Sequence, residues 1–80
     1  MSNIRKEADR VLESFTVDTE AFQIGEDSVA QYNFNFGYAC GQISGLSSVC
    51  DWSDFNYVAS IRSKIEQMFL NSERKTSDTI

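Results

Sequence analysis

The run from Ser28 to Cys50 contains no charged side chain, and it carries glycine at every fourth position, at Gly37, Gly41 and Gly45. Apolar residues recur in the same run at steps of three and four residues, which is the spacing of one face of an α-helix. These apolar positions are Val29, Tyr32, Phe36, Ala39, Ile43 and Leu46. On a helix, the three glycines form a row without side chains beside the apolar face. A close packing partner is therefore expected on that row.

The first half of this run also fits a β-strand. Aromatic residues from Tyr32 to Tyr38 alternate with small or polar residues, which is a period of two. Pairing of residues 19–24 with 29–38 would give an α+β fold with a two-stranded hairpin at 19–38. Such a sheet is marginally stable without further support, and the helical spacing continues through Leu46. We therefore predict a helix from Ser28 to about Ser48.

Two amphipathic helices are predicted on either side of this run. Asn3–Phe15 and Asp54–Leu70 each place apolar residues on one face and charged residues on the other. Thr16–Asp27 lacks this regularity and is predicted to be an irregular connector. Val49–Trp52 is predicted to be a break, and Ser53 is a candidate helix cap.

The length of 80 residues allows one domain. We predict an all-α fold in which residues 1–70 form a short N-terminal helix and an antiparallel helical hairpin, followed by a flexible polar tail at 71–80. A chain of this size buries a modest core. With two cysteines it cannot build a disulfide scaffold, so self-association into a homodimer is expected.

The net charge of −5 is unevenly distributed, because no lysine or arginine occurs from Val11 to Ile61. Nucleic-acid binding needs clustered basic residues, so this pattern disfavours a nucleic-acid partner. An acidic surface suits solubility and favours basic partners. The residues predicted to form this acidic surface are Glu20, Glu26, Asp27, Asp51 and Asp54.

The residue types present argue against an enzyme, a cofactor or a metal site. Histidine is absent, which removes imidazole bases and histidine-containing zinc sites. Two cysteines are too few for a four-thiolate site. Asp51 and Asp54 are the best candidates for an acid–base pair, but a loop residue and a helix cap are the simpler interpretation. The glycine row lacks the lysine of a phosphate-binding loop.

The sequence does not predict a membrane protein. No basic segment followed by an apolar core opens the chain, as a signal peptide would require. The uncharged run is long enough to span a bilayer, but it contains several amide side chains, such as Gln31, Asn33 and Gln42, that are costly in hydrocarbon. A cytoplasmic location is the expectation.

The segment from Phe36 to Leu46, followed by a short break and an amphipathic helix to Ile65, resembles helical hairpins in small phage and prophage proteins. The resemblance covers under half of the chain. It implies a helical hairpin and an origin in a mobile element, and it implies no activity.

Aromatic residues suggest where a partner binds. One helix cannot bury all the aromatic residues from Tyr32 to Tyr38 on a single side, and tyrosine and tryptophan are favoured at interfaces. The predicted interface residues are Phe34, Gly37, Tyr38, Gly41, Gly45 and Trp52. Whether the glycine row forms a contact within the chain or between chains stays open.

These features favour a small acidic protein-interaction module that is not an enzyme. The hypothesis is a homodimer that binds and modulates a protein partner, as a phage or prophage inhibitor or accessory factor would. The alternative is a dimeric regulator associated with nucleic acid. The basic residues that it would use are Arg5, Lys6, Arg10, Arg74 and Lys75.

Overall fold

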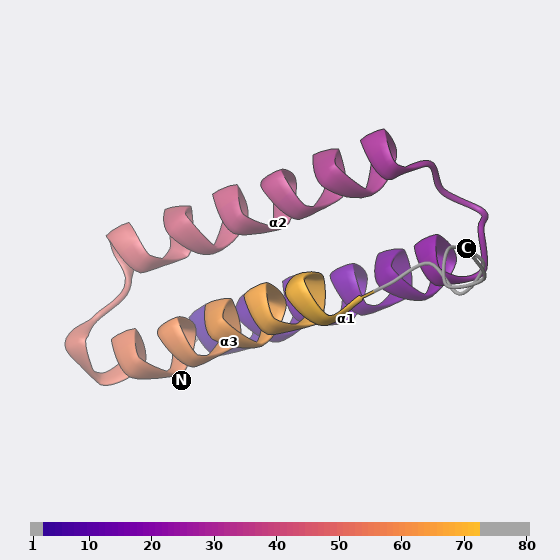
Figure 1. The fold of residues 1–80 in the computed structure, drawn as a ribbon. Helices are drawn as coiled ribbons and strands as arrows, with labels where there is room; N and C mark the ends of the chain where they lie inside the picture. The colour runs from indigo at the N-terminus through magenta and orange to yellow at the C-terminus, as the bar shows by residue number, and fades with distance from the viewer. Residues whose placement is uncertain (1–2, 73–80) are drawn as a thin grey trace.

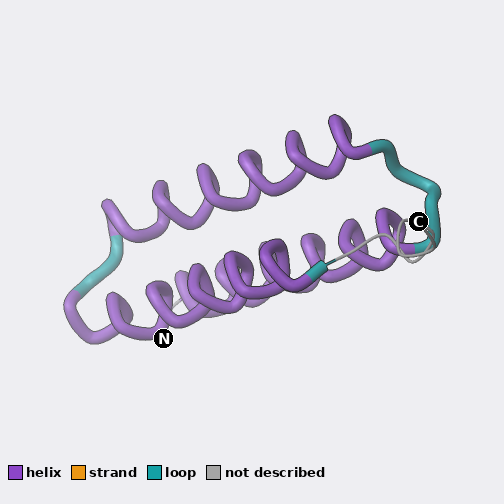
Figure 2. Tube along the Cα trace, viewed as in Figure 1, coloured by secondary structure: helices purple, strands orange, loops and turns teal. Residues whose placement is uncertain are grey.

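The computed structural model describes residues 3–72, which form three helices: α1 (Asn3–Gln23), α2 (Val29–Val49) and α3 (Trp52–Asn71). The helices run up, down and up, so that α2 is antiparallel to both of its neighbours (Figure 1). Each helix packs against the other two. The described residues contain no strand (Figure 2). The predicted all-α class is confirmed, and the alternative hairpin at 19–38 is wrong.

Helix α1 is longer than predicted, because the segment expected to be an irregular connector continues it to Gln23. The buried face that includes Phe15 carries on through Thr19 and Phe22 at helical steps of four and three residues. The Thr16 hydroxyl donates a hydrogen bond to the Leu12 carbonyl one turn earlier, at 2.8 Å. Burial of these side chains outweighs the weak helix propensity of the threonines.

Gly25 ends α1 in a backbone conformation that favours glycine, with a φ of 88°. The Gly25 N–H donates to the Phe22 carbonyl at 3.1 Å, and the Glu26 N–H donates to the Ala21 carbonyl at 2.8 Å. This pair of bonds is the Schellman motif, which satisfies carbonyls at the end of a helix. The predicted chain break at residues 25–27 therefore has a defined geometry.

Gly25→Ala is expected to lower the free energy of unfolding by about 1–2 kcal/mol, because a Cβ atom is strained in the left-handed region. Urea denaturation of the two proteins measures this difference. Gly25→Asn is the matched control, since asparagine tolerates this conformation better than alanine. Its free energy of unfolding should fall by less than that of Gly25→Ala. Equal stability of wild type and Gly25→Ala would contradict the assignment.

Side-chain and backbone caps define the other helix ends. The Ser28 Oγ accepts a hydrogen bond from the Gln31 backbone N–H at 3.0 Å and caps α2. Helix α3 begins at Trp52, with Asp51 at the capping position. Trp52 was predicted to lie in the break, and Ser53 was predicted to be the cap. Both residues lie inside α3, so the helix starts earlier than expected.

The core is aromatic where α1 and α2 face each other. The Tyr32 ring stacks on Phe22 with centroids 4.3 Å apart and on Phe15 at 5.4 Å. The hydroxyl groups of Tyr32 and Thr19 share a buried hydrogen bond of 2.7 Å. Helix α3 adds Phe69, which stacks on Phe36 at 4.0 Å. The remaining large, fully buried side chains are Ile43, Val58, Ile61 and Ile65.

Candidate interaction surfaces

The glycine row of α2 faces away from the core. A Cβ atom added at Gly37, Gly41 or Gly45 would meet nothing within 4 Å. The alternative in which this row lets another helix of the same chain pack closely is therefore wrong. The reason is rotational, since the core face of α2 is formed by Tyr32, Ala39 and Ile43, and the glycines lie on the other side of the helix. The row is open to a second molecule.

Two large aromatic side chains stand beside the glycine row. Phe34 is 66% exposed and Tyr38 is 63% exposed. Their rings are stacked with centroids 6.4 Å apart, as residues four apart on a helix can be. The two predicted aromatic anchors of α2 thus form one exposed cluster with Gly37 and Gly41.

The exposed ridge of α2 has the spacing of a helix-pairing seam. Exposed residues follow one another at alternating steps of four and three, which is a heptad pattern. They are Ala30, Phe34, Gly37, Gly41, Ser44 and Ser48. Five of these six residues are small. We call this set, together with Tyr38 and Gly45, the α2 seam.

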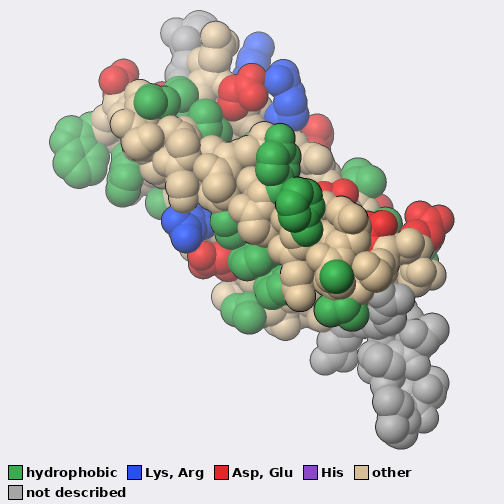
Figure 3. Space-filling model, turned by 90° about the horizontal axis from the view of Figure 1, so that it is seen from above, with side chains coloured by type: hydrophobic (Ala, Val, Ile, Leu, Met, Phe, Trp, Pro, Cys, Tyr) green, Lys and Arg blue, Asp and Glu red, His purple; other side chains and the backbone are tan. Residues whose placement is uncertain are grey.

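No residue of α2 carries a charge. Figure 3 looks down on this face, where hydrophobic side chains lie in the middle of a surface of backbone and uncharged side chains, and the acidic and basic side chains lie to either side. The Gln31 amide donates to the Asn35 side-chain oxygen at 2.9 Å. Exposed faces of helices are usually rich in charged residues, so the α2 seam is unusual for a surface in contact with water alone.

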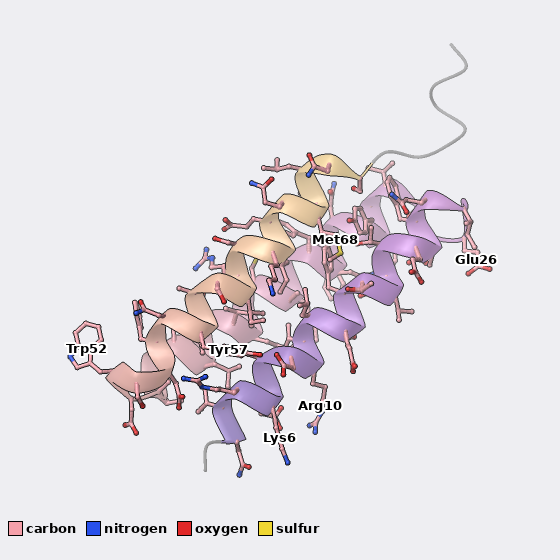
Figure 4. All side chains as sticks on the ribbon, turned by 90° about the horizontal axis from the view of Figure 1, so that it is seen from below. Lys6, Arg10, Glu26, Trp52, Tyr57 and Met68 are labelled. Carbon is pink, nitrogen blue, oxygen red and sulfur yellow. The ribbon has the colours of Figure 1, made fainter. Side chains whose placement is uncertain are left out.

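Trp52 lies at one end of the bundle and is 85% exposed. Its ring meets Phe55 edge to face, with centroids 5.6 Å apart. Together with Cys50, these two residues line an open hollow of about 260 Å³. Figure 4 shows the Trp52 side chain pointing away from the helices. The structure therefore places this predicted anchor on the surface, beyond the end of the α2 seam.

Asp54 is not part of an acidic surface, which corrects the prediction. It is only 6% exposed, and its Oδ1 accepts a hydrogen bond from Arg5 Nε at 2.8 Å. Arg5 Nη2 also donates to the Ser53 carbonyl at 2.9 Å, and the guanidinium lies 4.8 Å from the centre of the Tyr57 ring. Arg5 thus joins the start of α1 to the start of α3, a contact across 49 residues of sequence that local patterns do not reveal.

The other predicted acidic residues do not form one surface. Glu20 and Glu26 are exposed and Asp27 is half-buried, near the end of α1. Asp51 is exposed at the opposite end, beside Trp52. Asp18, which the sequence did not single out, joins the first group, because burial and the negative charge of Asp27 both raise its pKa. The acids are therefore divided between the two ends of the bundle.

Two titratable side chains outside the acidic groups, Cys40 and Tyr57, have raised pKa values. No group of three or more cysteine, aspartate or glutamate side chains within residues 3–72 could hold a metal ion. Burial raises the pKa of the Cys40 thiol, and Glu66 raises it further against the opposing effect of Arg62. A hydrogen bond from the Tyr57 hydroxyl to Asp9, followed by burial and the Asp9 charge, raises the pKa of Tyr57. Both groups are thus held in their neutral, less nucleophilic forms.

The fold and its surfaces define a three-helix bundle with an uncharged outer helix face. No described helix combines the length and the apolar character that crossing a bilayer requires. Comparison of the chain with protein-family models, with curated proteins and with solved structures finds no match.

Proposed function

We propose that this chain is a protein-interaction module that is not an enzyme, and that it forms a homodimer through the α2 seam and acts by binding a protein partner. The observation that carries the proposal is the glycine row, which is exposed and has no packing role within the chain. The resemblance to phage and prophage hairpins, and with it a role as an inhibitor or accessory factor, stays a prediction.

The free energy of the helix supports this use of the glycines. Each glycine in the interior of a helix is about 0.8–1 kcal/mol less favourable than alanine. The row therefore lowers the stability of the monomer by about 2–3 kcal/mol in total. Because no contact within the described residues requires the missing side chains, a contact with another molecule is the physical reason that remains.

The charge distribution favours a second copy as the occupant of the seam. Two copies with a net charge of −5 repel each other over most of their surfaces. The α2 seam lets them meet without bringing charges together, and an isologous pair places the same patch on both subunits. Small side chains allow helix axes to approach to about 8 Å, and Phe34 and Tyr38 of each copy then cover the glycines of the other.

Gly41→Glu is expected to weaken dimerisation at least ~100-fold, because it places a charge in the middle of the buried seam of each subunit. The fold is expected to persist, since a Cβ atom at this position has open space. Sedimentation equilibrium from 1 to 100 μM measures the dissociation constant, and circular dichroism checks the helix content.

Ala59→Glu is the matched control, because Ala59 is an exposed small residue on α3 outside the seam. This variant has the same net charge as Gly41→Glu. Its dimer dissociation constant is expected to stay within about threefold of the wild-type value. A wild-type protein that is monomeric at 100 μM would contradict the proposal. Equal dissociation constants for Gly41→Glu and wild type would also contradict it.

The pairing of the arginines weakens the nucleic-acid alternative. Arg5 is bonded to Asp54 at 2.8 Å, Arg10 to Glu7 at 2.9 Å and Arg62 to Glu66 at 3.1 Å. Each arginine that the structure describes is thus paired with a carboxylate, whereas binding to phosphates depends on available basic side chains. Arg74 and Lys75, which the alternative also needs, lie outside the described residues.

A further inference from the structure

A second unpartnered surface lies on α1, near the end of the bundle opposite Trp52. Val17 is 63% exposed and Ile24 is 68% exposed. Together with Ala21, Glu20 and Glu26 they line an open hollow of about 440 Å³. The apolar residues at 17, 21 and 24 follow the i, i+4, i+7 spacing by which one helix presents anchors to another. The core residues of α1 lie on a different face of that helix, and the α2 seam lies on a different helix.

Two carboxylates lie at this hollow, and no basic side chain is part of its lining. Glu20 and Glu26 form part of its lining. Asp18 and Asp27 lie close enough to each other that the charge of Asp27, together with burial, raises the pKa of Asp18. No lysine or arginine occurs in the sequence between Arg10 and Arg62. Figure 4 shows Lys6 and Arg10 toward one end of α1 and Glu26 beyond the other end.

We infer that this hollow binds a basic amphipathic helix of the protein partner. The apolar side chains of that helix pack on Val17, Ala21 and Ile24, and lysine or arginine on either side pairs with Glu20 and Glu26. Charge complementarity selects this occupant. A neutral helix would desolvate the carboxylates without giving them a partner, and an acidic helix would be repelled.

This inference names the partner chemistry within the proposed function, and it depends on a different surface from the dimer. The hollow is shallow and accommodates a few side chains, so the expected dissociation constant is about 10–100 μM at low salt. Exposed charge pairs are screened by salt. Binding is therefore expected to weaken about tenfold or more between 50 and 300 mM sodium chloride.

Three fluorescein-labelled helical peptides of equal length test the inference by fluorescence anisotropy. The first carries leucine at i, i+4 and i+7 with lysine on both sides of that face. The second replaces each leucine by serine, and the third replaces each lysine by glutamate. The first peptide is expected to bind, the second to bind at least ~10-fold more weakly, and the third to show no binding.

Two variants locate the binding site. Ile24→Ser and the double variant Glu20→Gln/Glu26→Gln are each expected to weaken binding of the first peptide at least ~10-fold. Val49→Ser and Asp51→Asn are the matched controls, since they change a 72% exposed apolar residue and an exposed acid at the other end of the bundle. The controls should bind within twofold of wild type.

The inference is overturned if the serine peptide binds as tightly as the leucine peptide, because the attraction is then non-specific. It is also overturned if the hollow variants bind as wild type does, or if no peptide binds at 1 mM protein in 50 mM sodium chloride. Gly41→Glu protein separates the two proposals, since it should be monomeric and still bind the first peptide. Loss of dimerisation and loss of peptide binding are thus measured independently.

Discussion

Tyr32→Ala is expected to lower the free energy of unfolding by about 3–5 kcal/mol, the range for removing a large aromatic side chain from a core. Tyr32 is 3% exposed. Its ring contacts Phe22 at 4.3 Å, Phe15 at 5.4 Å and Phe69 at 5.3 Å between centroids. It is therefore a side chain of α2 that contacts both of the other helices. Truncation leaves a cavity among three rings and removes contacts between all three helices.

The expected loss is large compared with the whole stability of the protein. Folded chains are stable by about 0.05–0.15 kcal/mol per residue, which gives about 4–12 kcal/mol for a chain of this length. Tyr32→Ala is therefore expected to be largely unfolded at 37 °C or to melt far below wild type. Circular dichroism at 222 nm during urea and thermal denaturation measures the difference.

Tyr32→Phe is the matched control, because it keeps the ring and removes only the hydroxyl. The Thr19 hydroxyl, which is buried, then loses its 2.7 Å hydrogen bond to Tyr32. A buried polar group without a partner costs about 1–3 kcal/mol. The free energy of unfolding of Tyr32→Phe should therefore lie between those of wild type and Tyr32→Ala. A loss under 1 kcal/mol for Tyr32→Ala would contradict the described packing.

The triple variant Gly37→Ala/Gly41→Ala/Gly45→Ala is expected to stabilise the monomer by about 2–3 kcal/mol. Each added methyl group has open space, with no heavy atom of a neighbouring element within 4 Å. Alanine restricts the unfolded chain more than glycine does and favours the helix, so the gain needs no new contact. Urea denaturation at 1 μM protein, where the monomer is favoured, measures it.

Gly25→Ala provides the opposite control in the same chain. The substitution is chemically identical, but the positive φ of Gly25 makes it destabilising. If the triple variant is instead less stable than wild type, the glycine row must be covered by part of the chain, and the open α2 seam would be wrong. A higher free energy of unfolding for the triple variant thus indicates an open glycine row, and a lower one indicates a covered row.

The sequence predicts the central helix well, because its apolar spacing persists from Val29 to Leu46. It also contains the information that the glycines face outward. Nine residues make two and a half turns of an α-helix, so Gly41 lies on the opposite side from Tyr32. The prediction that the glycine row lies beside the apolar face is therefore wrong.

The second half of α1 was harder to predict from sequence. Thr16, Val17 and Thr19 have low intrinsic helix propensity, and Asp18 is a common capping residue. Burial of Phe22, together with the hydrogen bond between Thr19 and Tyr32, depends on contacts with other helices. Such tertiary contacts override local preference, and a single sequence does not display them.

The exposure of the predicted surface residues agrees with the sequence for some of them and differs for others. Phe34 and Tyr38 are exposed, because aromatic residues in excess of one helix face must point outward, and Trp52 is exposed at the first position of α3. Asp54 has the local sequence of a capping residue, yet its buried carboxylate is paired with the half-exposed Arg5. Its partner is distant in the chain, so only the fold brings the two together.

The dipoles of the three described helices do not cancel completely, so the bundle has a net helix dipole. Each helix has a partial positive charge at its amino end and a partial negative charge at its carboxyl end. Because α1 and α3 are parallel (Figure 1), the opposite orientation of α2 cancels only one of them. The remaining helix dipole has its negative pole at the end that carries Glu20 and Glu26. A cation that reaches this end of the bundle therefore meets the carbonyl ends of two helices in addition to the two carboxylates.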